Sequence, residues 1–178
     1  MPNIVPFEEV GHLFEDFEHT AWRLETQRGY AVDRISPKWQ RWLDGEPLGY
    51  DPDQPWHANV RAQAEAGKRI ERVRIVDDPP TEGQRFLLAS GLGNVEAGED
   101  IRNISRADAE RHGLPDFDFW LFDSRLLVRF HFDDRGETLG VELTEDPSRI
   151  AQACQVRDVA WHYALRTAEF QRGVRSPM

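Results

Sequence analysis

Large apolar side chains are densest over residues 117–143, and their spacing predicts three consecutive β-strands. Every second residue of 126–132 is apolar, and after a polar turn at 133–137 the same alternation resumes over 139–143. A period of two on both sides of a short turn predicts a β-hairpin. Residues 117–122 carry apolar side chains on both faces, which is typical of a strand that is covered on both sides.

The N-terminal part of the chain is expected to be helical. Residues 6–26 carry apolar side chains at spacings of three and four, which predicts an amphipathic helix with Pro6 in its first turn and Gly29 just past its end. The apolar residues of this stripe are Phe7, Val10, Phe14, Phe17, Ala21 and Leu24. Two shorter helices are expected after Ser36 and over about 56–66, separated by a loop rich in proline and glycine.

The second half of the chain changes to a pattern of strands and helices. Residues 69–76 and 100–104 indicate strands, and between them Thr81 and Gln84 have the spacing of a capping box that opens a helix. Two strands joined by a helix predict a parallel pair in a right-handed unit. The last helix is expected to begin at Asp146-Pro147.

Together these elements predict a fold of the α/β or α+β class. We expect a mixed β-sheet with a right-handed βαβ unit and an antiparallel hairpin, covered by helices. The length favours one domain over 1–178. Within it, 1–67 forms a helical N-terminal segment, and 68–172 forms the α/β portion with the C-terminal helix.

One charged residue is expected on the packing face of the last helix. Arg157 falls on a stripe whose other members are Ile150, Cys154, Trp161, Ala164 and Ala168. An unpaired buried guanidinium is costly, and Arg157 is therefore expected to pair with a carboxylate, with Glu25 and Asp123 as the candidates. A structural ion pair that ties this helix to the sheet and a ligand-binding arginine both remain open.

The composition limits the partners of this chain. Its formal net charge is −10, so no global positive field attracts nucleic acid or an anionic membrane. A single cysteine excludes an internal disulfide, and the sequence shows neither a signal-peptide pattern nor an apolar stretch of membrane-spanning length. We expect a cytoplasmic protein that binds neither nucleic acid nor membranes directly.

Several segments resemble an actinobacterial family of uncharacterised domains, and the resemblance covers nearly the whole chain. The segments are AWRLETQRGY, WHANVRAQAEAGKRIERVRIVDDPP, NVEAGEDIR, LPDFDFWLFDSRLLVRFHFDD and RDVAWHYA. Members of that family typically lie beside genes for helix-turn-helix regulators, so the resemblance implies a protein that acts as a regulatory partner. It supplies no catalytic residues.

A second resemblance is to one half of a phospholipase-D-like fold, in which a G-x-x-I-R strand precedes a strand of the form W-L-F-D. It implies a sheet that fits the strand order predicted above. The catalytic H-x-K-x4-D motif of that fold is not found at His131, because Phe132 and Asp133 follow it and no lysine stands two positions on. The resemblance therefore implies the fold without the phosphodiesterase chemistry.

Two smaller groupings have chemical potential but simpler explanations. His12, Glu15 and His19 share one face of the first predicted helix and could bind a metal, but that face lies opposite the apolar stripe and is expected to be solvated. Asp158 and His162 are spaced to orient an imidazole, with surface pairing as the simpler interpretation. We expect no metal and no other cofactor.

Asp123-Ser124-Arg125 is the most interesting candidate site, because it ends a strand that is otherwise apolar on both faces. The simpler interpretation is a polar turn in which Asp123 accepts backbone hydrogen bonds. If the polar residues of this region converge, they form an aromatic-walled pocket for a small anion or an acidic side chain. The candidate ligand-binding residues are Trp22, Glu25, Asp123, Arg125, Arg129, His131, Arg157 and Trp161.

Two functional hypotheses follow. In the first, the chain is a non-catalytic regulatory or interaction module whose acidic surface docks a basic protein such as a helix-turn-helix regulator; its signature is an exposed aromatic patch without an enclosed polar pocket. In the second, the chain is an enzyme or small-molecule-binding protein with a phospholipase-D-like fold. Its signature is a deep cleft toward which most of the polar candidates in 123–131 point. The first is preferred, and a homodimer is compatible with the second.

Overall fold

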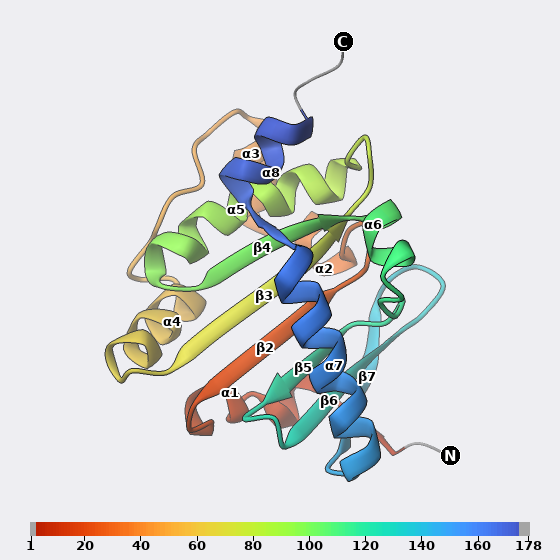
Figure 1. The fold of residues 1–178 in the computed structure, drawn as a ribbon. Helices are drawn as coiled ribbons and strands as arrows, with labels where there is room; N and C mark the ends of the chain where they lie inside the picture. The colour runs from red at the N-terminus through yellow and green to blue at the C-terminus, as the bar shows by residue number, and fades with distance from the viewer. Residues whose placement is uncertain (1–2, 175–178) are drawn as a thin grey trace.

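The computed structural model describes residues 3–174 and contains one mixed sheet (Figure 1). Its strands are β1 (Ile4–Val5), β2 (Thr20–Glu25), β3 (Arg69–Val76), β4 (Asp100–Ser105), β5 (Phe119–Phe122), β6 (Leu126–Phe132), β7 (Thr138–Thr144) and β8 (Leu165–Arg166). Their spatial order is β1-β7-β6-β5-β2-β3-β4-β8. Strands β2, β3 and β4 are parallel to one another, and the other neighbouring pairs are antiparallel. The predicted α/β or α+β class is confirmed.

Helices pack on both faces of the sheet. They are η1 (Phe7–Val10), α1 (Leu13–Asp16), α2 (Ala31–Arg34), α3 (Pro37–Leu43), α4 (Pro55–Glu65), α5 (Glu82–Ala97), α6 (Arg106–Arg111), α7 (Pro147–Tyr163) and α8 (Thr167–Val174). Helix α7 crosses one face, where α6 also packs, and α1, α4 and the end of α5 pack on the other (Figure 1). Within residues 3–174, none of these helices is long and apolar enough to cross a membrane.

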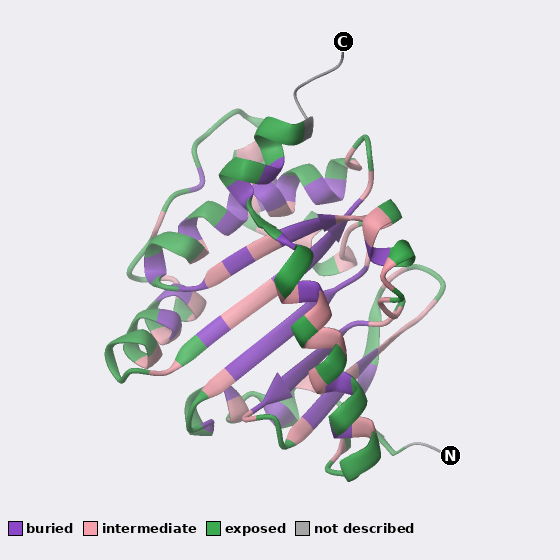
Figure 2. Ribbon diagram, in the orientation of Figure 1, coloured by how far each residue is buried: buried purple, intermediate pink, exposed green. Residues whose placement is uncertain are grey.

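The central strands are buried on both faces of the sheet (Figure 2). In β5, Phe119 and Leu121 belong to the hydrophobic cluster beneath α7. Trp120 and Phe122 belong to the cluster beneath α1 and α4. The predicted strand with two apolar faces is therefore confirmed, and so is the antiparallel hairpin of β6 and β7 that follows it.

The predicted pair of parallel strands joined by a helix is confirmed as well. Helix α5 begins with a capping box in which the Thr81 hydroxyl accepts the N–H of Gln84 and the Gln84 side chain accepts the N–H of Thr81. Gly91 weakens this helix in isolation. In the fold it is required, because a Cβ at Gly91 would lie 2.6 Å from Nη1 of Arg74 on the neighbouring strand.

The predicted N-terminal helix over 6–26 is wrong. The segment forms η1, α1 and then β2, which lies between β3 and β5 in the middle of the sheet. Because the strand is covered on both sides, Trp22 and Leu24 pack beneath α7, while Arg23 and Glu25 point to the opposite face. The segment 1–67 therefore contributes a central strand to the sheet, not helices alone.

The C-terminal helix ends before the last residues of its predicted stripe. Helix α7 ends at Tyr163, and the chain then adds the short strand β8 to β4 before entering α8. The buried residues of α7 are Ile150, Ala153 and Ala160. Its packing face is therefore centred on small side chains that allow close contact with the sheet.

Arg157 lies at the margin of this packing face, with 25% of its side chain exposed. Its guanidinium donates to Oγ of Ser124 at 2.7 Å and to Asp158 at 3.2 Å. The predicted pairing with Glu25 or Asp123 is wrong, because both carboxylates are held by other groups. The guanidinium thus joins α7 to the turn after β5 through a hydroxyl.

Because its contacts are partly solvated, replacing Arg157 should cost little. Arg157→Ala is expected to lower the free energy of unfolding by less than about 1 kcal/mol. Urea denaturation of the variant and the wild type measures this difference. Ser124→Ala should have a similarly small effect, and the double variant should lose no more than Arg157→Ala alone. A loss of roughly 3 kcal/mol would show that a buried ion pair had been broken.

Candidate functional site

A cleft of about 1380 Å³ lies on the face of the sheet opposite α7. Segments from the N-terminus, α2, α3, α5 and the turn between β6 and β7 surround it. Aromatic side chains form much of its wall; they are Phe7, Phe14, Tyr30, Trp56, Phe86, Trp120, Phe130 and Phe132. Typical small-ligand pockets measure roughly 300–1,000 Å³. This cleft is therefore large enough for a segment of another protein.

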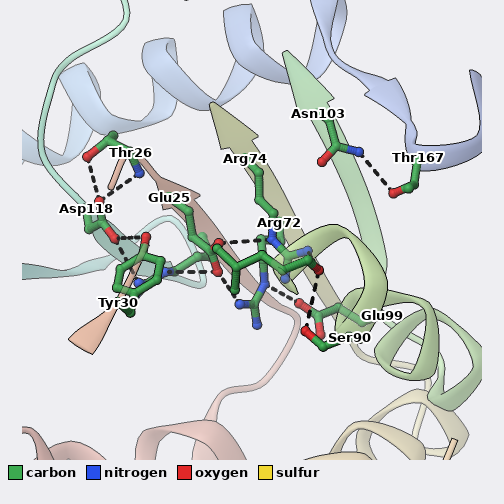
Figure 3. Close-up of polar contacts among 12 residues, drawn as sticks. Glu25, Thr26, Tyr30, Arg72, Arg74, Ser90, Glu99, Asn103, Asp118 and Thr167 are labelled. Carbon is green, nitrogen blue, oxygen red and sulfur yellow. Dashed lines mark hydrogen bonds and ion pairs between the residues drawn. The ribbon is translucent and has the colours of Figure 1, made fainter. Parts of the chain in front are cut away.

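The floor of the cleft carries charged side chains from two parallel strands (Figure 3). Arg23 and Glu25 are two residues apart on β2, and Arg72 and Arg74 are two residues apart on β3, so that all four project from the same face. Glu25 accepts a hydrogen bond from Nε of Arg74 at 3.0 Å and another from Nη1 of Arg72. Burial by itself raises the pKa of Glu25, but the positive charges of the arginines lower it to about 2.

Arg72 connects this floor to the residue that precedes β4. Its Nε donates to Glu99 at 2.6 Å, and the other carboxylate oxygen of Glu99 accepts from Nε1 of Trp56 at 3.1 Å. The guanidinium also lies 5.5 Å from the ring centroid of Trp120 and 5.9 Å from that of Trp56. Two carboxylates and two indole rings therefore fix the position of this arginine.

Asp118 binds the remaining arginine at the other end of the floor. It immediately precedes β5, is fully buried, and accepts from Nη2 of Arg23 at 2.9 Å. It also accepts from the backbone N–H and the hydroxyl of Thr26, at 2.8 and 2.6 Å, and from the hydroxyl of Tyr30 at 2.5 Å. Burial raises the pKa of Asp118 despite these donors, and burial and the charge of Asp118 together raise the pKa of Tyr30.

Three buried polar atoms of cleft-lining residues have no hydrogen-bond partner within residues 3–174. They are Nε of Arg23, Oδ2 of Asp33 and Oε1 of Gln54. Nε of Arg23 lies 3.9 Å from Glu25, beyond hydrogen-bond distance. Burial, and secondly the negative charge of Glu25, raise the pKa of Asp33 to about 6. The cleft wall thus has hydrogen-bonding capacity that the chain itself does not use.

Of the eight candidate ligand-binding residues, Glu25 lies in the cleft. Trp22 stands three positions before it but packs beneath α7 on the opposite face. Asp123 accepts the backbone N–H groups of residues 18–20 at 2.8, 2.7 and 3.0 Å, which confirms the interpretation of this segment as a polar turn. Arg125 is exposed beyond that turn.

The other candidates are held by separate neighbours. The guanidinium of Arg129 lies 3.9 Å from the ring centroid of Phe117, and His131 lies 3.3 Å from a carboxylate on β7. The ring of Trp161 lies 3.7 Å from the guanidinium of Arg102. Since each of these side chains has its own partner outside the cleft, the structure does not bring them together with Glu25.

Sequence reasoning misses three of the four floor residues, namely Arg23, Arg72 and Arg74. The alternation of Arg72 and Arg74 with Val73 and Ile75 suggests a strand with one solvated face. The structure instead places β3 between β2 and β4, and its second face forms the floor of the cleft, where Arg74 is buried and Arg72 is half-buried. The sequence signal that could have identified these floor residues is a pair of arginines two positions apart in a strand that is expected to pair with parallel neighbours.

The groupings considered for metal binding and for acid–base chemistry lie on the surface. His12, Glu15 and His19 are exposed in the segment around α1, and Asp158 and His162 are exposed on α7. No group of three His, Cys, Asp or Glu side chains in the described part of the chain is placed to hold a metal ion. These residues therefore add no ligands to the cleft.

Comparison with known proteins supports the phospholipase-D-like fold. The chain is similar to NucT from Helicobacter pylori, at 9% identity and a TM-score of 0.53, over 93% of this chain and 97% of that chain. It is also similar to Nuc from Salmonella typhimurium, a phospholipase D family member, at 13% identity and a TM-score of 0.50, over 89% and 88% of the two chains. At such identities the likeness shows the fold alone.

Comparison with the curated proteins finds no match. A family match extends over residues 8–172 and so includes the cleft floor, the hairpin and α7. The chain belongs to the family described as a domain of unknown function, DUF6879.

Proposed function

We propose that this chain is a non-catalytic interaction module with a phospholipase-D-like fold that acts with a helix-turn-helix regulator. Asp118 carries the proposal. It is a carboxylate at the position where the catalytic motif of the fold requires a lysine, and both of its oxygens are occupied by donors of this chain.

The position of Asp118 follows from the spacing of the H-x-K-x4-D motif. When Asp123, the last residue of W-L-F-D, is taken as its final residue, the lysine position falls on Asp118 and the histidine position falls on Asp116. Two carboxylates cannot replace a nucleophilic imidazole and a cation that stabilises phosphoryl oxygens. His131 belongs to the next strand and is paired with β7.

The other charged groups of the cleft are poorly suited to acid–base catalysis. Glu25, with its pKa of about 2, is a weak base at neutral pH. Asp33 has a pKa of about 6, but the hydroxyl of Ser36, which lines the same cleft, donates to the backbone carbonyl of Asp33 at 2.7 Å. No activated nucleophile of the serine type is therefore formed by this pair.

Size and charge favour a protein partner. The cleft exceeds the volume of a typical small-molecule pocket. The net charge of −10 complements the basic surface that a DNA-binding regulator needs for its own contact with phosphates. The gene neighbourhood implied by the family resemblance indicates the same class of partner.

A small-molecule-binding protein is the second candidate, and the charged floor favours it. The predicted signature of an interaction module is an exposed aromatic patch without an enclosed polar pocket, and the cleft departs from that signature. The polar residues expected to line a ligand pocket lie outside the cleft, however, with the exception of Glu25. Direct partner binding therefore decides between the two candidates.

The first expected outcome concerns catalysis. The purified chain should hydrolyse bis-(p-nitrophenyl) phosphate no faster than buffer, because the motif positions carry carboxylates. An active phospholipase D assayed in parallel controls for the substrate. Hydrolysis above background that disappears in Asp118→Asn or in His131→Ala would overturn the non-catalytic proposal.

The second concerns the partner. The tagged chain, purified from its native host, should retain a helix-turn-helix regulator that mass spectrometry identifies. That regulator, purified separately, should bind the purified chain in isothermal titration calorimetry. If the two purified proteins do not interact, or if the retained proteins contain no DNA-binding regulator, the proposed partner class is wrong.

The third concerns the Glu25 ion pairs. The folded-state pKa of Glu25 is about 2 and its ordinary value is 4.5, so its contribution to stability is present above about pH 4.5 and is lost as the pH falls toward 2. Glu25→Gln should lower the free energy of unfolding at pH 7 by roughly 3 kcal/mol, because buried arginines lose their counterion.

Denaturant unfolding at several pH values measures this effect. The difference between wild type and Glu25→Gln should shrink as the pH falls from about 4.5 toward 2. Glu137→Gln changes an exposed carboxylate at the edge of the same cleft. Its free energy of unfolding should equal that of the wild type at every pH. Equal losses in the two variants would contradict the assigned role of Glu25.

A further inference from the structure

The mouth of the cleft is bordered by exposed apolar side chains. They are Ile4, Val32, Ile35 and Leu139, with exposures of 40%, 66%, 84% and 62%. They come from β1, the α2 region and β7, which are far apart in the sequence but line one cleft. Exposed apolar groups that gather around a concavity are typical of a surface that binds another molecule. We call this set the apolar rim.

The floor beneath the rim does not favour an anion. Its three arginines are matched by three buried carboxylates, Glu25, Glu99 and Asp118. Arg23 and Arg74 are buried, and Arg72 has 12% of its side chain exposed. An added carboxylate or phosphate would therefore leave an excess negative charge in a buried region. A neutral acceptor such as a peptide carbonyl adds no charge, and the guanidinium of Arg23, with 8% of its side chain exposed, has an unpartnered Nε.

The mouth, in contrast, is acidic. Its carboxylates are Glu8, Asp33, Asp51 and Glu137, and its cations are Lys38 and Arg41. Arg41 is already paired with Glu46 at 2.9 Å. Asp33 is the most enclosed of these acids, since one of its oxygens is buried without a partner among the described residues. Lys38 and two floor arginines lie near Asp33, but no cation among the described residues forms an ion pair with it within 4.0 Å. A partly buried carboxylate that is not directly paired is favourable for binding a cation from outside.

We propose that the cleft binds an apolar peptide segment of the partner protein that carries one lysine or arginine, with the cation on Asp33 and the apolar side chains on the rim. This inference rests on the proposed function, since it names the part of the partner that docks. Backbone carbonyls of the segment face the arginine floor. The acidic mouth selects a basic segment, and the neutral floor disfavours an acidic one.

Selection from a phage-displayed library of random dodecapeptides tests the chemistry of the occupant without knowledge of the partner. Selection on the wild-type chain should enrich peptides in which a lysine or arginine stands among apolar residues. A matched peptide with norleucine in place of the basic residue keeps the apolar contacts and removes the charge. Fluorescence anisotropy gives the Kd of both peptides for each variant.

Asp33→Asn should weaken binding of the basic peptide about tenfold and leave binding of the norleucine peptide unchanged. Ile35→Ser should weaken binding of both peptides by a similar factor, because it removes rim area only. Glu110→Gln and Leu165→Ser, which change an exposed acid on α6 and an exposed apolar side chain on β8, should have no effect. Circular dichroism verifies that each variant is folded. If Asp33→Asn does not fold, binding of the two peptides to Ile35→Ser carries the test.

Three outcomes would overturn the inference: no enriched peptide, enrichment of acidic peptides, or equal weakening of both peptides by Asp33→Asn. Failure of the proposed function is recognised separately. If the purified regulator binds wild type and Asp33→Asn equally well, the regulator docks elsewhere and the proposed function stands. If the regulator binds neither protein, the proposed function fails as well.

Discussion

The ion pairs around Glu25 constrain the middle of the sheet. The register between β2 and β3 places Arg23 beside Arg72 and Glu25 beside Arg74, so that three guanidinium groups crowd one small area of the cleft face. Glu25 is placed among them, and the residues that lead into β4 and β5 supply Glu99 and Asp118. Loss of any one carboxylate would leave a buried positive charge. A slip of one residue between β2 and β3 would turn these side chains to the other face, so the ion pairs are compatible with this register of the two strands.

The same network determines the character of the cleft. Charges that are matched within the floor neither attract an anion nor act readily as proton donors or acceptors. Nor can the arginines move freely, because aromatic rings and carboxylates hold them; the Arg23 guanidinium, for example, lies 4.1 Å from the ring centroid of Phe130. In the proposed complex, recognition is therefore left to the border of the cleft, where apolar side chains are exposed and Oδ2 of Asp33 has no hydrogen-bond partner among the described residues.

Much of the fold could be predicted from the sequence because its strands and helices have regular periods. The alternation over 126–132 and the two-sided apolar segment before it identify β5, β6 and β7, and the capping box identifies α5. The error at β2 has a physical cause. Three short elements, η1, α1 and β2, happen to place apolar residues at helical spacing, and only a strand explains why Arg23 and Glu25 alternate with Trp22 and Leu24.

The site could not be predicted in the same way, because it forms where regular packing ends. On one face, the long helix α7 covers the middle of the sheet, and the polar groups there find neighbours such as Phe117 for Arg129. On the other face, α4 and α5 together with short elements and loops surround the cleft and leave it open. The position of such a cleft depends on how aperiodic segments fold over the sheet. The sequence therefore shows which strands carry charged residues on both of their faces. Which of these residues face a cavity depends on the topology of the fold. Here Arg23 and Glu25 face the cleft because they alternate along β2 with Trp22 and Leu24, which pack beneath α7 on the opposite face.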